Sequence, residues 1–227
     1  MVLNENERIE DLGGGFQIIQ DKTKFCYGTD AAVLAKFIAA KPKEKVIDLC
    51  SGTAIVPILL CKYTKCADFT ALELQEEMCA IANRSVALNG LEDKIKVICG
   101  DLKDVKMMFA SGSFDVVSCN PPYMVKGTGK MNGSFSVQIA RHKIFCTLED
   151  VVRSSAFLLK SGGRFYMVHR AERLVGIFVL MRNYKIEPKK MTWVCAGPNS
   201  APSLVLVEGQ KDRNSGIVVT KPLYVNF

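Results

Sequence analysis

Apolar residues occur along this chain in two alternating patterns: short unbroken runs, and longer stretches with helical spacing. The run at 45–50 (KVIDLC), for example, precedes a stretch at 54–64 where apolar residues recur every three or four positions. The pattern predicts strands at 15–20, 45–50, 68–74, 94–100, 113–119, 164–170, 190–196 and 203–209. It predicts helices at 29–40, 54–64, 75–90, 148–163 and 171–183.

Strands that alternate with helices and are themselves apolar form parallel sheets covered on both faces. We therefore expect an α/β, Rossmann-like fold with a mainly parallel seven-stranded sheet and a short N-terminal extension. The chain contains no repeat or linker-like tract, so we expect one domain over 1–227. Its extension and first helix would occupy 1–44, and the ligand-binding sheet 45–227. Ligands of such sheets bind beyond the carboxyl ends of the strands.

Acidic residues follow three successive predicted strands. Asp48 precedes a small-residue turn (LCSGTA), Glu73 lies 21 positions after Gly52, and Asp101 follows the next strand. A carboxylate about 20 positions past such a turn can accept hydrogen bonds from a ribose. Asp48 would then face a cationic group, while Asp101 accepts from an adenine amino group and Leu102 packs on the ring. The turn has one glycine only, which fits S-adenosylmethionine better than a pyrophosphate.

The segment NPPY follows the strand at 113–119. Each proline fixes φ and lacks an N–H group, so the turn is stiff. The side-chain oxygen of Asn120 and the carbonyl of Pro121 offer two acceptors, with Pro122 next in the turn, and Tyr123 offers a stacking face. Two acceptors and a ring suit a planar NH₂ group that attacks a methyl donor. Asn120 cannot take a proton, so its predicted role is positioning and electrostatic stabilisation.

Composition changes this interpretation little. The chain has 227 residues, a net charge of +7, nine cysteines and two histidines. The charge is compatible with a polyanionic partner. The cysteines show no metal-ligand spacing, so we expect free buried thiols and no metal. No segment suits a signal peptide or a membrane span, which predicts a cytoplasmic protein.

The motifs VIDLCSGTA, ALEL, CGDL and NPPY, in this order, resemble class I S-adenosylmethionine-dependent methyltransferases that act on nitrogen. The flanking stretches KFCYGTDAAVLAKF and ARHKIFCTLEDVV, and the tail LVLVEGQKDRNSGIVVTKPLYV, are similar to the tRNA1(Val) adenine-37 N6-methyltransferase family. This sequence departs from the family pattern at Ala54, where a glycine is usual, and at Lys143, where an acidic residue is expected.

The resemblance implies transfer of a methyl group to N6 of an adenine in tRNA, at anticodon-loop position 37. We expect a monomer or weak dimer. It implies that the target base is held by Asn120, Pro121, Pro122 and Tyr123. The expected cofactor-binding residues are Tyr27, Gly28, Thr29, Asp30, Asp48, Ser51, Gly52, Thr53, Glu73, Leu74, Asp101, Leu102 and Asn120. The long Gly-, Ser- and Lys-rich segment after Tyr123 suggests RNA contacts, and the candidates are Lys126, Lys130, Arg141, His142 and Lys143.

Other functions remain compatible with these motifs. A protein glutamine N5-methyltransferase would hold an NH₂ group of the same geometry, but 45 residues before Val46 are too few for the helical recognition domain that those enzymes carry. Guanine N2 of ribosomal RNA and adenine of DNA are further acceptors. A non-catalytic RNA-binding protein on a methyltransferase fold is the alternative from a different class, and the intact NPPY segment and three acids count against it.

Overall fold

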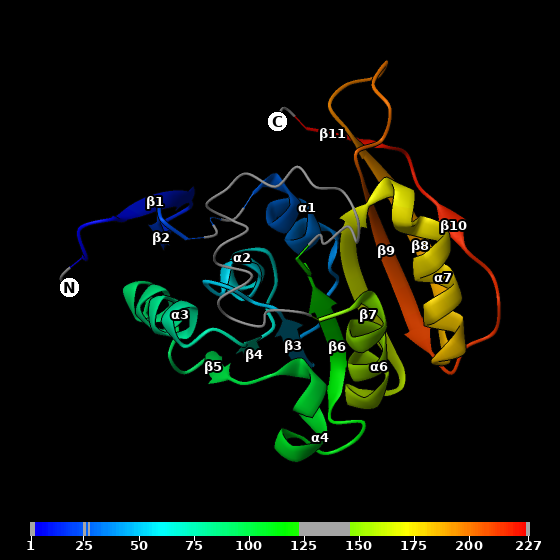
Figure 1. Ribbon diagram of the computed structural model, residues 1–227, viewed down its shortest axis with the longest axis horizontal. Coiled ribbons are helices and arrows are strands. Elements are labelled where there is room, and N and C mark those ends of the chain that lie inside the picture. The colour runs from blue at the N-terminus through cyan, green and yellow to red at the C-terminus, as the bar shows by residue number, and fades with distance from the viewer. Residues whose placement is uncertain (1–2, 25, 27, 123–145, 226–227) are drawn as a thin grey trace.

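The computed structural model describes residues 3–24, 26, 28–122 and 146–225, and within them most strands join one sheet (Figure 1). A separate two-stranded sheet consists of β1 (Glu7–Gly13) and β2 (Phe16–Asp21). The large sheet contains β3 (Lys45–Leu49), β4 (Asp68–Glu73), β5 (Ile95–Cys99), β6 (Phe114–Cys119), β7 (Leu159–Arg170), β8 (Ile186–Cys195), β9 (Leu204–Lys211), β10 (Val218–Val219) and β11 (Leu223–Tyr224). The helices are α1 (Thr29–Phe37), α2 (Ile55–Tyr63), α3 (Glu76–Leu88), η1 (Leu102–Asp104), α4 (Val105–Met108), α6 (Leu148–Leu158), η2 (Ala171–Arg173) and α7 (Leu174–Asn183).

The predicted seven strands form the body of the large sheet, in the order β5-β4-β3-β6-β7-β9-β8. Pairing is parallel from β5 to β7 and antiparallel for β7 with β9 and β9 with β8. The two-residue strands β10 and β11 add to the outer edge of β8. This arrangement confirms the predicted Rossmann-like, mainly parallel α/β fold.

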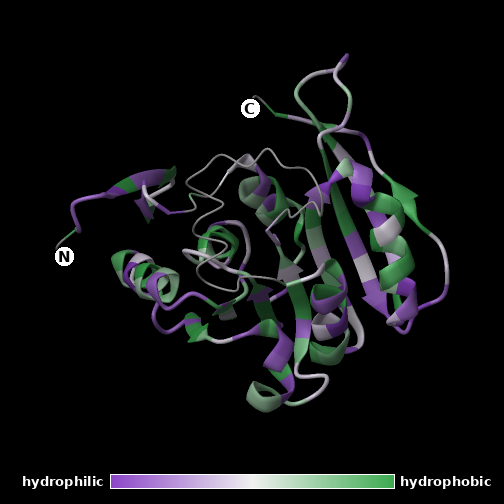
Figure 2. Cartoon of the chain, in the orientation of Figure 1, coloured by the Kyte–Doolittle hydropathy of each residue, from purple (hydrophilic) through white to green (hydrophobic). Residues whose placement is uncertain are grey.

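Helices cover both faces of the sheet, and each face has its own apolar core. On one face α1, α2 and part of α3 pack against strand residues such as Val46, Val116 and Tyr166. On the other face α4, α6 and α7 pack against residues such as Ile47, Val117 and Phe165. Consecutive residues of one strand thus belong to opposite cores, as a pleated strand requires. The central strands are accordingly apolar along most of their length (Figure 2).

The N-terminal hairpin is fixed to α3 by side chains that bond to its backbone. Asn89, the C-cap of α3, accepts from Gln17 N at 2.8 Å and donates to Gln17 O at 2.7 Å. Ser85 Oγ accepts from the buried Ile19 N at 3.1 Å. The hairpin therefore lies at the α3 end of the molecule, far from β8 and α7 (Figure 1).

The predicted helix at 148–163 is wrong in its last turn, because α6 ends at Leu158. The ammonium group of Lys211, on β9, donates to the carbonyls of Ala156 at 2.6 Å and Leu159 at 2.8 Å. Leu159 instead pairs with Phe114 as the first residue of β7. A distant strand thus supplies the partners that end the helix.

Two further differences concern the second half of the sheet and the N-terminus. The strand predicted at 190–196 begins earlier, at Ile186, with a register shift beside Pro188. The short strands β1, β10 and β11 were not in the predicted set. In the described part of the chain, no helix has the length and apolar character needed to cross a membrane.

Candidate active site

The predicted turn and the NPPY segment begin at neighbouring positions in the sheet. Leu49, the last residue of β3, pairs with Cys119, the last residue of β6. Between these two strands the chain order of the sheet reverses, because β4 lies on the far side of β3 and β7 on the far side of β6. This is the kind of switch point at which open α/β sheets bind ligands. The cofactor turn (residues 50–54) and Asn120 therefore face the same edge.

The backbone of the cofactor turn is left-handed at three of its five residues. Cys50 has φ 54°, Gly52 φ 57° and Ala54 φ 63°. Glycine adopts this conformation freely, whereas a residue with a Cβ pays roughly 1–2 kcal/mol. The glycine that the related family has at position 54 would thus suit this backbone, and Ala54 holds the same turn under strain.

Glu73 is fixed directly beside this turn. Its carboxylate accepts from Gly52 N at 2.9 Å and from Gln75 N at 3.0 Å. The residue is 6% exposed. Two backbone donors from different elements hold the carboxylate in one orientation and leave further acceptor capacity for a ligand such as a ribose.

Asp48 is buried in the centre of the sheet, one residue before the end of β3. The Ser118 hydroxyl, from the paired position on β6, donates to its Oδ1 at 2.6 Å. Burial, with a smaller contribution from the charge of nearby Glu73, raises the pKa of the Asp48 carboxyl to about 7, against the lowering effect of this hydrogen bond. A cation next to Asp48 would lower this pKa and so favour the ionised carboxylate.

The two acids fit the cationic cofactor that the sequence predicts. Asp48 and Glu73 are both buried, and within the described residues neither forms an ion pair. A buried carboxylate is unfavourable unless a positive charge lies beside it, and a bound ligand can supply that charge. The sulfonium and ammonium groups of S-adenosylmethionine would supply it.

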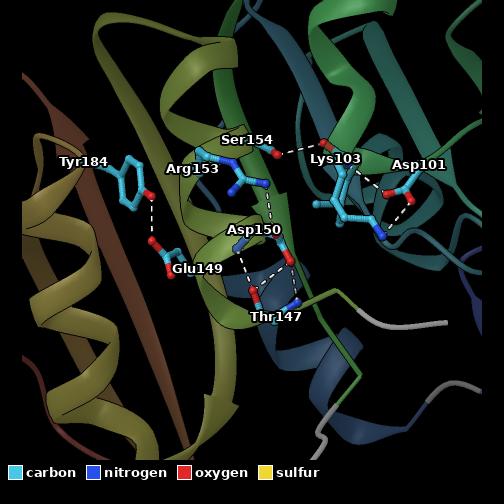
Figure 3. Close-up of polar contacts among 9 residues, drawn as sticks. Asp101, Lys103, Thr147, Glu149, Asp150, Arg153, Ser154 and Tyr184 are labelled. Atoms are coloured by element: carbon cyan, nitrogen blue, oxygen red, sulfur yellow. Dashed lines mark hydrogen bonds and ion pairs between the residues drawn. The ribbon is translucent and has the colours of Figure 1, made fainter. Parts of the chain in front are cut away.

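Asp101 lies two residues after the end of β5 and is the N-cap of η1. Its Oδ1 accepts from Lys103 N at 2.9 Å, and its Oδ2 pairs with Lys103 Nζ at 3.1 Å (Figure 3). This contact raises the pKa of the Lys103 ammonium group. Leu102 is buried, and its carbonyl accepts from Ser154 Oγ of α6 at 2.7 Å, whereas Leu74 is exposed. Each Asp101 oxygen keeps a lone pair with which it can accept from an adenine amino group.

Asn120, Pro121 and Pro122 continue directly from β6. Asn120 is half-buried, Pro121 is buried and Pro122 is exposed. Asn120 is one residue past the Leu49–Cys119 pair and so lies level with Cys50, the first residue of the cofactor turn. Ser51 and Thr53 of that turn are buried as well. The structure thus brings together the amide and the turn that the sequence assigned to one site.

Gly28, Thr29 and Asp30 lie at the start of α1, where Gly28 is the N-cap. They line a cleft together with residues from the end of β7 and the start of β9, such as Arg170 and Leu204. The residues that line this cleft include neither Asp48 nor Glu73. The contact of Gly28, Thr29 and Asp30 with the cofactor stays a prediction.

The start of α6 is the first described segment after the NPPY turn. Thr147 and Asp150 form a capping box: Asp150 N donates to Thr147 Oγ1 at 3.1 Å, and Thr147 N donates to Asp150 Oδ2 at 2.9 Å. Arg153 pairs with Asp150 at 2.6 Å, and Tyr184 of α7 donates to Glu149 at 2.8 Å (Figure 3). These bonds fix the start of α6 against α7.

Seven of the predicted site residues lie outside the described residues. They are Tyr27, Tyr123 and the five RNA-binding candidates Lys126, Lys130, Arg141, His142 and Lys143. Sequence reasoning missed Ser118, whose role depends on strand pairing. It also missed that Cys50 lies 3.8 Å from Cys146, sulfur to sulfur. All nine cysteines are free thiols as expected, but only Cys66, Cys79, Cys119 and Cys195 are buried, and Cys99 is exposed.

Comparison with known proteins finds methyltransferases. A family model described as "Methyltransferase domain" matches residues 46–132. The chain is 26% identical over 193 residues to a tRNA1(Val) (adenine(37)-N6)-methyltransferase of Bacteroides thetaiotaomicron, covering 85% of this chain and 79% of the relative. An enzyme of the same name from Tolumonas auensis is also 26% identical, with the same coverage of both chains. A crystal structure described as a predicted O-methyltransferase of Agrobacterium tumefaciens superposes with a TM-score of 0.69 at 20% identity, covering 86% of each chain.

The fold, the motifs and these similarities define the chain as a class I methyltransferase that uses S-adenosylmethionine. Within that class, the resemblance of its sequence to the tRNA1(Val) adenine-37 N6-methyltransferase family is confirmed.

Proposed function

We propose that this chain transfers a methyl group from S-adenosylmethionine to the exocyclic N6 of an adenine in tRNA, at anticodon-loop position 37. The placement of Asn120 beside the cofactor turn carries this proposal, since Asn120 follows the strand residue paired with Leu49. An amide oxygen and a proline carbonyl at this place suit an amine that attacks a methyl group. The proposed substrate is the one for which the two relatives are named, adenine-37 of a tRNA.

The residues at the end of β6 position the acceptor. Asn120 Oδ1 and the carbonyl of Pro121 would accept the two N–H bonds of the adenine amine, which directs the nitrogen lone pair at the methyl group. Tyr123 would stack on the base. The proton released from the methylated amine goes to solvent, because an amide side chain is no base at neutral pH. The contribution of these groups is orientation and charge stabilisation.

The acids at the other strand ends orient the cofactor, which supplies an electrophilic methyl group. Glu73, already fixed by two backbone donors, would accept from the ribose hydroxyls. Asp48 would balance the positive charge, while Asp101 and Leu102 would hold the adenine ring.

The partner in this proposal is tRNA in the cytoplasm. An adenine in an anticodon loop is already largely unpaired, so extruding it into the site costs little. Lys126, Lys130, Arg141, His142 and Lys143 are the proposed phosphate contacts. Changing Lys126 and Lys130 together to alanine should reduce the slope of log affinity for tRNA against log salt concentration by about 2. An unaltered slope would exclude both lysines from the interface.

The direct test is methyl transfer from labelled S-adenosylmethionine to total tRNA, total ribosomal RNA and release factor in parallel, followed by nucleoside analysis. Label recovered as N6-methyladenosine in tRNA, and absent with Asn120→Ala, would support the proposal. Label in protein alone would point to glutamine methylation. Label in ribosomal RNA as N2-methylguanosine would point to the third candidate, and no label in any acceptor would refute the proposed activity on tRNA.

A further inference from the structure

An open cleft of about 570 Å³ lies beside the candidate active site. It is lined by the start of α1, by the end of β7 with the following turn, and by the residues that lead into β9. The lining residues are Gly28, Thr29, Asp30, Arg170, Ala171, Glu172, Pro202, Ser203 and Leu204. The volume is large enough for a nucleotide and is in the range typical of small-molecule sites.

The strand register places this cleft one strand away from the target-base position. Cys119, the last residue of β6, pairs with Met167 of the parallel strand β7. β6 ends at Cys119, whereas β7 runs on for three residues to Arg170, so Arg170 lies at the same edge of the sheet, on the strand next to the one that the NPPY segment follows. Leu204 pairs with Arg170 from the other side. The cleft therefore lies at the same edge of the sheet as the NPPY segment, beside the strand adjacent to β6.

The lining of the cleft combines groups that a nucleotide needs. Arg170 is exposed and offers a cationic fork of N–H donors. Asp30 and Glu172 offer carboxylate acceptors, and Pro202 and Leu204 offer apolar surface. A small free anion would be repelled by two carboxylates. A nucleotide presents a phosphate to the arginine and hydroxyl or amino donors to the acids.

We propose that this cleft binds the nucleotide next to the target adenine in the RNA strand, with Arg170 contacting its phosphate. This inference rests on the proposed function and adds a subsite to it. An adenine held at Asn120 remains joined to both neighbours, so a neighbouring nucleotide must lie within one backbone unit of the NPPY segment. The cleft would hold that neighbour while the target base is extruded.

The test uses a tRNA anticodon stem-loop and two arginines of the same turn. Arg170 lines the cleft, whereas Arg173 is equally exposed and does not. We expect Arg170→Ala to lower kcat/KM for the stem-loop by about 10-fold, and the slope of affinity against salt by about 1. Arg170→Lys should restore the slope but not the full rate, and Arg173→Ala should change neither. The affinity for S-adenosylmethionine should stay unchanged in all three variants.

A chemical change in the RNA identifies the contact. Replacing one phosphate next to the target adenine by an uncharged methylphosphonate should cost the wild-type enzyme about as much as Arg170→Ala does. On that RNA, Arg170→Ala should then cause little additional loss, because the same contact is already gone. The two flanking phosphates are replaced one at a time.

The outcomes separate the subsite from the proposed function. If the wild-type enzyme methylates the stem-loop while Arg170→Ala and Arg173→Ala behave alike, the subsite is refuted and the function stands. The subsite is also refuted if the loss in kcat/KM from Arg170→Ala adds in full to the loss from each of the two methylphosphonates. Should Arg170→Ala fail to fold, a wild-type enzyme indifferent to both methylphosphonates would overturn the proposal. A wild-type enzyme inactive on all RNA would refute the function itself.

Discussion

Asp48 offers the sharpest test of the electrostatics of the site. In the folded protein without cofactor, burial raises the pKa of this carboxyl to about 7, whereas an unfolded aspartate ionises near the ordinary 3.8. The folded state therefore prefers the protonated form. The stabilisation from this group is fully present below pH 3.8, decreases as the pH rises from 3.8 to about 7, and is lost above that. At about 1.4 kcal/mol per pH unit, the loss above pH 7 amounts to about 4 kcal/mol.

Asp48→Asn removes the titration but keeps a side-chain oxygen that can accept from Ser118. We expect the stability of the variant, relative to wild type, to increase by roughly 3 kcal/mol between pH 5 and pH 8, without cofactor. Urea unfolding at several pH values measures this difference. Asp68→Asn is the matched control, because Asp68 is an exposed aspartate at the start of β4.

The same reasoning predicts how the cofactor behaves. A bound cation favours the ionised carboxylate, so the affinity of wild-type protein for S-adenosylmethionine should rise as the pH increases through 7. Asp48→Asn should bind more weakly and lose this pH dependence, as calorimetry can measure. Parallel stability profiles for Asp48→Asn and wild type without cofactor would refute the argument, since they would mean that Asp48 ionises in the fold as it does in water.

Three further predictions concern single side chains. Asn120→Ala should lower kcat for methyl transfer by about 10²-fold while leaving cofactor affinity unchanged; equal turnover would exclude the proposed amine contact. Glu73→Ala should first weaken cofactor binding, because it also frees Gly52 N, and an unchanged dissociation constant would remove Glu73 from the ribose. Asn89→Ala should cost about 2 kcal/mol in urea unfolding, because two bonds to Gln17 hold the hairpin on α3. A midpoint equal to that of wild type would show that the hairpin docks without them.

Much of the fold and the candidate site could be predicted from the sequence because the relevant signals are local and ordered. Apolar runs that alternate with helical periodicity specify strands and helices one after another, and a parallel sheet then brings every strand end to one edge. Asp48, Glu73, Asp101 and Asn120 each follow or end such a run, so their placement at one edge of the sheet can be predicted from chain order.

Tertiary structure decided what depends on neighbours distant in sequence. Ser118 bonds to Asp48 because β6 pairs with β3 in one register, and no local pattern reports that register. The helix at 148 ends at Leu158 because Lys211, from β9, takes up its last carbonyls. Likewise the cleft beside the NPPY segment combines side chains from three separate parts of the chain, Arg170 among them. Such contacts arise only when the sheet has closed, since packing and register, and not propensity, bring those groups together.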